Sequence, residues 1–199
     1  MASFLTAGIA IVLALLTVRR RKAPGNVALA LLMSAIAFWT FARGFEAAAV
    51  DMTWKVFWGK SEYFGIVSVP VLWFLFVFQY TRTDRWLTSR NVALLWVIPV
   101  ITILMAITNG WHGLMWSNIA PSPGRETEVL IYTHGTWFWV HAAYCYALMV
   151  LGSFQLFKTT FANIRMYRLQ SLSILIAVLI PWVGNGIYLL GYSPIPGLD

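Results

Sequence analysis

The chain has 199 residues, of which 60% are hydrophobic and 11% are charged, and its formal net charge is +7. A soluble domain averages about 45–50% apolar and about 25% charged residues, so this composition excludes a soluble globular fold. The apolar runs do not alternate with polar residues at every second position, which also excludes a membrane β-barrel. The sequence predicts an all-α, polytopic membrane protein that forms a single domain over residues 1–199.

Six apolar runs are predicted to cross the bilayer, since a spanning helix needs about 20 predominantly apolar residues. The expected spans are residues 4–18, 27–50, 60–80, 92–108, 136–157 and 169–190. The third is apolar and rich in aromatic residues, and we expect the others to pack around it. Pro70, Pro99 and Pro181 lie inside three spans, and each frees a mid-helix carbonyl that a neighbour or a water must satisfy. The longest connection, residues 110–135, is expected to be a loop.

The basic residues predict which side of the membrane each loop faces. Ten of the fourteen Lys and Arg residues lie in residues 19–26, 81–91 and 158–168. Positively charged loops stay in the cytoplasm, so the N-terminus and residue 199 are expected outside. A seventh span beyond Asp199 would return the chain to the cytoplasm, and we expect one in the natural protein. No nucleic-acid partner is expected, because the charges lie at span ends rather than on one face.

Polar and aromatic side chains in the spans suggest a binding cavity. Polar groups inside a bilayer are costly and are functional candidates by default. The polar candidates fall in the outer half of the bilayer or at its outer edge, which predicts an outward-facing cavity lined by Trp and Tyr with a few polar anchors. The candidate ligand-binding residues are Glu46, Glu62, Trp73, Asn109, His141, Tyr144, Asn185 and Tyr188.

Structural explanations exist for the same residues. Arg43 and Glu46 could simply pair near the membrane interface. His141 could act as an interhelical hydrogen-bond donor to Asn185 or Glu46. An aromatic belt at the membrane–water boundary accounts for most of the outer Trp residues.

The sequence gives little support for a metal site, a bound cofactor or a catalytic site. His112, His134, His141 and Glu62 lack a recognised zinc-ligand spacing. Only His141 lies clearly inside a span, whereas haem ligation by paired histidines needs two. Every Lys is at a span end, so these six spans offer no retinal-type Schiff base. No Gly-x-Ser-x-Gly motif is present either, and we expect no metal, no cofactor and no enzymatic activity in this chain.

Four stretches carry a resemblance to a known family. They are residues 61–65 with Pro70, Trp73, Phe76 and Tyr80; Pro99 with residues 108–109, His112 and Trp116; Gly135 with Phe138, Tyr144 and Tyr146; and residues 168–170 with Pro181, Asn185, Tyr188 and residues 196–199. Their order over about residues 25–199 resembles the N-terminal seven-transmembrane region of sensor histidine kinases. The resemblance implies a sensory input domain in the cell membrane of a bacterium or archaeon. It also implies a seventh span and a cytoplasmic output domain after Asp199.

The sequence thus predicts that the chain binds a small, amphipathic or apolar ligand in an outward-facing cavity and relays binding to a cytoplasmic output domain. The expected partners are this ligand, the lipid bilayer and a second copy, with dimerisation through full-length output domains. The alternatives are a membrane-embedded enzyme or small-molecule transporter that uses the same cavity, and a structural dimerisation module. The last is disfavoured because small-xxx-small faces are few. A kinase or cyclase domain encoded beyond residue 199 would favour the sensor. A stop codon at that point would favour the alternatives.

Overall fold

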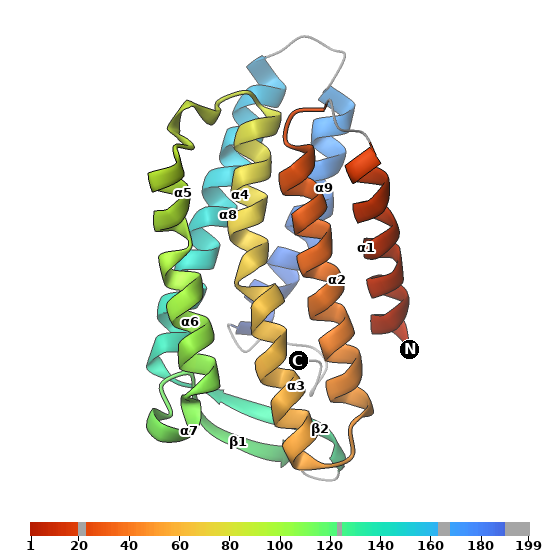
Figure 1. Cartoon of the computed structure of the whole chain (residues 1–199), viewed down its shortest axis with the longest axis vertical. Helices are drawn as coiled ribbons and strands as arrows, with labels where there is room; N and C mark the ends of the chain where they lie inside the picture. The colour runs from red at the N-terminus through yellow and green to blue at the C-terminus, as the bar shows by residue number, and fades with distance from the viewer. Residues whose placement is uncertain (20–22, 123–124, 163–167, 190–199) are drawn as a thin grey trace.

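The computed structural model describes residues 1–19, 23–122, 125–162 and 168–189. Long helices run side by side, and a two-stranded hairpin lies across one end of them (Figure 1). We call this the hairpin end, and the opposite end, where residues 81–88 connect two helices, the basic end. The first helix starts toward the hairpin end and runs to the basic end.

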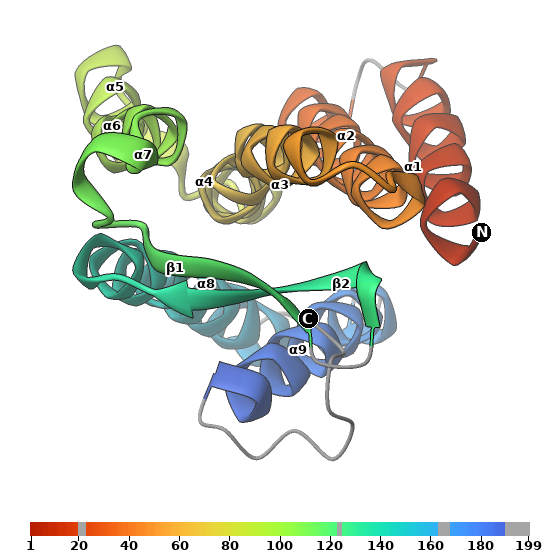
Figure 2. The same cartoon turned by 90° about the horizontal axis from the view of Figure 1, so that it is seen from below.

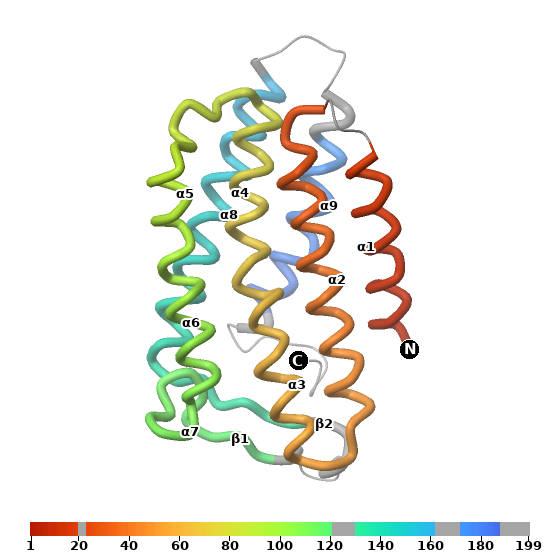
Figure 3. Tube along the Cα trace, in the orientation of Figure 1, coloured from red at the N-terminus to blue at the C-terminus, as the bar shows by residue number. Residues whose placement is uncertain are grey.

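The elements follow each other up and down the bundle (Figure 3). The first half contains α1 (Ala2–Arg19), α2 (Asn26–Ala48), α3 (Met52–Ile66), α4 (Ser68–Tyr80), the 3₁₀ turn η1 (Asp84–Trp86), α5 (Ser89–Leu95), α6 (Val97–Ile107) and α7 (Asn109–His112). The second half contains β1 (Trp116–Ser122), β2 (Arg125–His134), α8 (Thr136–Ala162) and α9 (Arg168–Leu189).

Five of the six expected spans correspond to helical segments long and apolar enough to cross a membrane. Among the described residues these are Ala2–Arg19, Asn26–Ala48, Met52–Tyr80, Ser89–Ile107 and Thr136–Phe161. The sixth expected span corresponds to α9, whose apolar stretch Leu172–Ile187 is shorter. The third segment starts eight residues earlier than expected, because the Asp51 side chain accepts a hydrogen bond from the Thr53 amide at 2.7 Å and caps α3 there.

The expectation that residues 110–135 form a loop is wrong, because this segment contains the hairpin. β1 and β2 pair antiparallel, with Ile119 opposite Tyr132 and Asn118 opposite Thr133. The fold of the described residues is therefore not purely helical. The run Ile131-Tyr132-Thr133 has the β-branched and aromatic composition that strands favour, but no hydrophobic periodicity distinguishes it from a loop of this composition.

α4 lies at the centre of the bundle, as expected for the third span. Every residue from Pro70 to Val77 is buried, and α4 packs against both α2 and α8. α1 packs on α2, and α9 on α8. Seen from below, α1 to α7 form one row, and the hairpin lies with α8 and α9 on the other side (Figure 2).

The contact between α4 and α8 depends on a glycine. A Cβ atom on Gly152 of α8 would lie 2.7 Å from Nε1 of Trp73 on α4, closer than real Cβ contacts. The absence of a side chain at Gly152 thus lets the indole of Trp73 fill the space between the two helices, where it is 2% exposed. Trp73 packs in the core in this arrangement, and its indole Nε1 has no hydrogen-bond partner among the described residues.

Pro70 and Pro99 lie just after breaks in two of the membrane-spanning segments. The backbone carbonyl that Pro99 leaves without its helical hydrogen bond has another partner. α3 and α4 meet at Val67, and α5 and α6 meet at Trp96, in each case three residues before a proline. Pro99 has no amide hydrogen to donate to the carbonyl of Leu95. The Tyr144 hydroxyl of α8 donates to this carbonyl at 2.6 Å instead. The expectation that a neighbour satisfies the freed group is confirmed for Pro99.

This arrangement predicts coupling between Tyr144 and Pro99. Tyr144→Phe should lower the free energy of unfolding by about 1 kcal/mol, the net value of a typical hydrogen bond. In a Pro99→Ala background the new backbone amide can donate to the Leu95 carbonyl, so Tyr144→Phe should there be nearly neutral. Denaturation of the four proteins in detergent measures the coupling, and equal losses in both backgrounds would contradict it.

Candidate functional site

Ionisable side chains lie inside the bundle at the hairpin end. Glu46, Lys55 and Glu62 are only 5%, 2% and 6% exposed. They come from α2 and α3, which pack side by side, and Tyr132 reaches them from β2. We call Arg43, Glu46, Lys55, Glu62 and Tyr132 the hairpin-end cluster. Buried charges need partners, so their contacts decide what the cluster can do.

Both carboxylate oxygens of Glu46 accept hydrogen bonds. Nη1 of Arg43 donates to Oε2 at 2.6 Å, and the Tyr132 hydroxyl donates to Oε1 at 2.7 Å. Nζ of Lys55 lies 3.3 Å from the backbone oxygen of Glu46 and donates to it. The structural explanation that Arg43 pairs with Glu46 is confirmed, and the pair forms part of a larger network.

Glu62 is less completely satisfied. Nε1 of Trp39 donates to its Oε2 at 3.2 Å, while Oε1 is buried and has no hydrogen-bond partner among the described residues. The carboxyl group of Glu62 lies within hydrogen-bonding reach of that of Glu46, a contact that requires a proton on one of the two groups, and Arg43 attracts both. An unpaired buried acceptor is costly, so Oε1 marks a position where a ligand that donates a hydrogen bond would be stabilised.

The Tyr132 hydroxyl stays protonated and so can donate its hydrogen bond to Glu46. Burial and the adjacent negative charge of Glu46 both raise the pKa of Tyr132 well above its usual value. The hydroxyl therefore keeps its proton at neutral pH. Gly59 of α3 makes room for it, because any side chain at that position would collide with the Tyr132 hydroxyl.

Asn109 holds the start of the hairpin in place. Its Oδ1 accepts from the amides of Met115 and Trp116 at 2.9 and 3.0 Å, and its Nδ2 donates to the Trp116 carbonyl at 2.9 Å. Trp116 in turn packs against the rings of Tyr63 and Tyr132, with centroids 5.2 and 5.4 Å apart. Asn109 thus connects α7 to the hairpin that covers the cluster.

The other candidates lie apart from the cluster. His141 is buried on α8, where Nε2 lies 3.1 Å from Sγ of Cys145. The alternative hydrogen bond to Asn185 or Glu46 is not present among the described residues. Its ring is 6.1 Å from that of Tyr63. Asn185 is exposed on α9 and accepts from the Tyr146 hydroxyl at 2.9 Å. Tyr188 lies in α9, and its side chain is outside the described part of the structure.

The structure therefore brings together Glu46 and Glu62 of the eight candidates, with Asn109 supporting the hairpin above them. Lys55, Tyr132 and Trp39 belong to this site but are not among the candidates predicted from the sequence. Lys55 lies between two expected spans, and Tyr132 lies in a segment predicted to be a loop. Among the described residues, no group of three or more His, Cys, Asp or Glu side chains could hold a metal ion.

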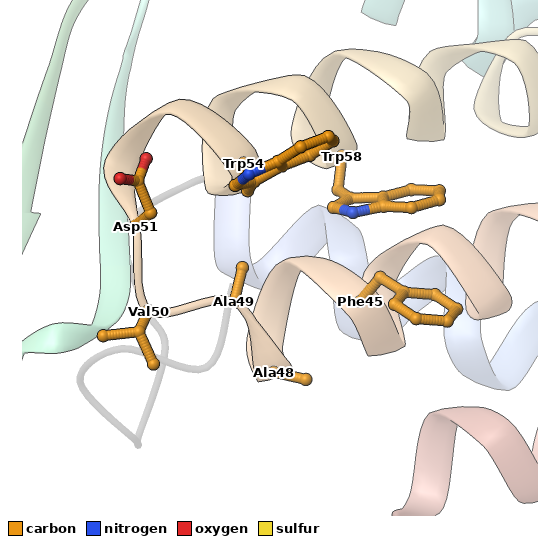
Figure 4. A pocket seen from close by; sticks show the side chains of 7 residues that line it. All are labelled: Phe45, Ala48, Ala49, Val50, Asp51, Trp54 and Trp58. Carbon is orange, nitrogen blue, oxygen red and sulfur yellow. The ribbon is translucent and has the colours of Figure 1, made fainter.

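Two surface grooves border α2. One, of about 320 Å³, lies at the turn between α2 and α3 and is lined by residues that include Phe45, Asp51, Trp54 and Trp58 (Figure 4). The other, of about 460 Å³, is lined by apolar and small residues of α2, α3, α4 and Trp96. Neither is lined by any of the eight candidates.

The helices define the class of the chain, a multi-pass helical membrane protein. A family model described as the N-terminal 7TM region of histidine kinase matches residues 2–199, and the chain belongs to this family. No curated protein and no solved structure matches the chain. The family confirms the resemblance seen in the sequence. It identifies the chain as the membrane-embedded sensory region of a histidine kinase rather than a catalytic domain.

The role of Asn109 can be tested with two substitutions. Asn109→Asp keeps the oxygen that accepts from Met115 and Trp116, whereas Asn109→Leu leaves both amides and the Trp116 carbonyl unpaired. An unsatisfied buried polar group costs about 1–3 kcal/mol, so Asn109→Leu should be the more destabilising change. Hydrogen exchange at the Met115 and Trp116 amides should accelerate strongly in Asn109→Leu and little in Asn109→Asp. Equal acceleration would contradict the role.

Proposed function

We propose that the chain binds a small amphipathic ligand at the hairpin-end cluster and relays binding to a cytoplasmic output domain. The observation that carries this proposal is Oε1 of Glu62, which is buried beside the ion-paired Glu46 and accepts no hydrogen bond from the described residues. In membrane segments, ionisable groups placed in this way commonly mark functional sites.

The surroundings of Glu62 suggest the chemistry of the ligand. An amine, hydroxyl or amide group would supply the missing donor to Oε1. Trp39, Tyr63 and Trp116 provide aromatic surface nearby. A ligand with one polar donor and an apolar body fits this combination, in keeping with the usual composition of small-molecule sites.

The basic residues support an orientation for the sensor. Arg82, Arg85 and Arg90 lie at the basic end, between α4 and the first turn of α5. With that end in the cytoplasm, the N-terminus and the hairpin end face outward across the cell membrane of a bacterium or archaeon. The ligand would then reach the cluster from outside or from the outer leaflet. Output domains of two copies would pair in the cytoplasm.

The helix junction at Val67 offers a route for the signal. Glu62 lies on α3, one turn before this junction, and α4 continues from it into the packed core. A ligand that binds better to one position of α3 than to another shifts the balance between the two. α4 would pass the shift to α2 and α8, against which it packs.

The proposal predicts a bound compound that depends on Glu62. Native mass spectrometry of the detergent-purified chain should detect a small molecule retained from the host membrane. Glu62→Gln should reduce its occupancy tenfold or more, a loss of about 1.4 kcal/mol. Asp84→Asn removes an acid at the basic end and is the matched control. This variant should retain the bound compound.

Chain yield and helical content monitor insertion and folding in each variant. An empty wild-type protein, or equal occupancy in wild type and Glu62→Gln, would contradict ligand binding at the cluster.

A further inference from the structure

The groove at the turn between α2 and α3 has features that the hairpin-end cluster does not explain. Its lining combines three aromatic rings, Phe45, Trp54 and Trp58, with the carboxylate of Asp51. Ala49 lies opposite Trp54 and leaves the space between them open (Figure 4). An aromatic belt accounts for tryptophans at a membrane boundary, but it does not require a carboxylate beside them.

The aromatic rings differ in how accessible they are. Phe45 stacks on Trp58 with ring centroids 4.8 Å apart and an interplanar angle of 21°. This contact holds Trp58 and covers part of its surface. Trp54 remains 58% exposed and presents its ring to the groove. A cation placed against the face of an indole is attracted by its quadrupole.

Asp51 supplies negative charge at this position. It accepts a hydrogen bond from the Thr53 amide, and this backbone bond lowers the pKa of Asp51 below its usual value, so the carboxylate is ionised at neutral pH. Asp51 is the charged residue among the lining residues of the groove. The nearby Arg43 and Lys55 are bonded to the side chain and the backbone of Glu46, on the interior side. The groove therefore favours a cation.

The position of the groove relative to the membrane indicates the source of that cation. It lies where the candidate spans Asn26–Ala48 and Met52–Tyr80 end and begin, which is the boundary between membrane and water. Phe41 and Phe57 are exposed on the same helices, at 41% and 51%, and would contact lipid chains. A lipid can thus occupy the groove with its headgroup while its chains remain in the bilayer.

We propose that this groove binds the ammonium headgroup of a zwitterionic phospholipid. The ammonium group would lie against the face of Trp54 with Asp51 as its counter-charge. Binding of this kind is independent of the hairpin-end cluster and of any ligand there. Anionic lipids without an ammonium group should be disfavoured by the charge of Asp51.

The test uses the chain in nanodiscs of equal parts phosphatidylcholine, phosphatidylethanolamine and phosphatidylglycerol, with the lipids retained on the protein identified by native mass spectrometry. Wild type should retain the two ammonium lipids over phosphatidylglycerol. Trp54→Leu and Asp51→Asn should each reduce this preference about threefold or more, as expected for loss of a cation–π contact or its counter-charge. Asp51→Asn suits the purpose because asparagine also caps helices.

Trp111→Leu is the control, because Trp111 is 89% exposed and does not line the groove. Its lipid preference should equal that of wild type. Equal retention of all three lipids, a preference unchanged in both groove variants, or an equal loss in Trp111→Leu would overturn the proposal. Soluble phosphocholine that competes as well as phosphatidylcholine would assign the groove to a soluble ammonium compound and overturn the lipid assignment.

Discussion

The structure of the hairpin end depends on the burial of the Glu46 carboxylate. A charge inside a helical bundle is tolerated only when hydrogen bonds and an opposite charge surround it, and loss of one partner costs about 3–5 kcal/mol. Arg43 supplies the charge from the preceding turn of α2, and Tyr132 supplies the second donor from the hairpin. Gly59 leaves the space that Tyr132 needs. The Glu46 carboxylate thus joins α2 to β2, at the place where Gly59 of α3 leaves room for the contact.

The two ends of the molecule have different physical character, and this difference suits a sensor. Toward the basic end, α4 is buried from Pro70 to Val77 and packs closely on α8 where Gly152 meets Trp73. At the hairpin end, polar groups alternate with aromatic rings, and one carboxylate oxygen of Glu62 has no partner among the described residues. The junction at Val67 separates these regions. In the proposed mechanism, a change at the polar end would pass through this junction to the packed core.

Local features of the fold were predictable, and contacts distant in sequence were not. Span length, the central position of the third span and the pairing of Arg43 with Glu46 follow from hydropathy and helical spacing. Tyr132 and Glu46 are 86 residues apart, and only the folded hairpin brings them together. The freed carbonyl before Pro99 was predictable, but its partner Tyr144 on another helix was not. For the same reason the sequence placed eight candidates in one cavity, whereas the structure gathers Glu46 and Glu62.

The central claim is that the hairpin is held on Glu46 by Tyr132, and a double-mutant cycle tests it most directly. Hydrogen exchange of the β1 and β2 amides in nanodiscs would be measured for wild type, Tyr132→Phe, Glu46→Gln and the double variant. A hydrogen bond to a charged group is worth about 1.5–3 kcal/mol, so the two changes should be coupled by about that amount. Additive effects, within about 0.5 kcal/mol, would show that Tyr132 and Glu46 act independently and would contradict the account.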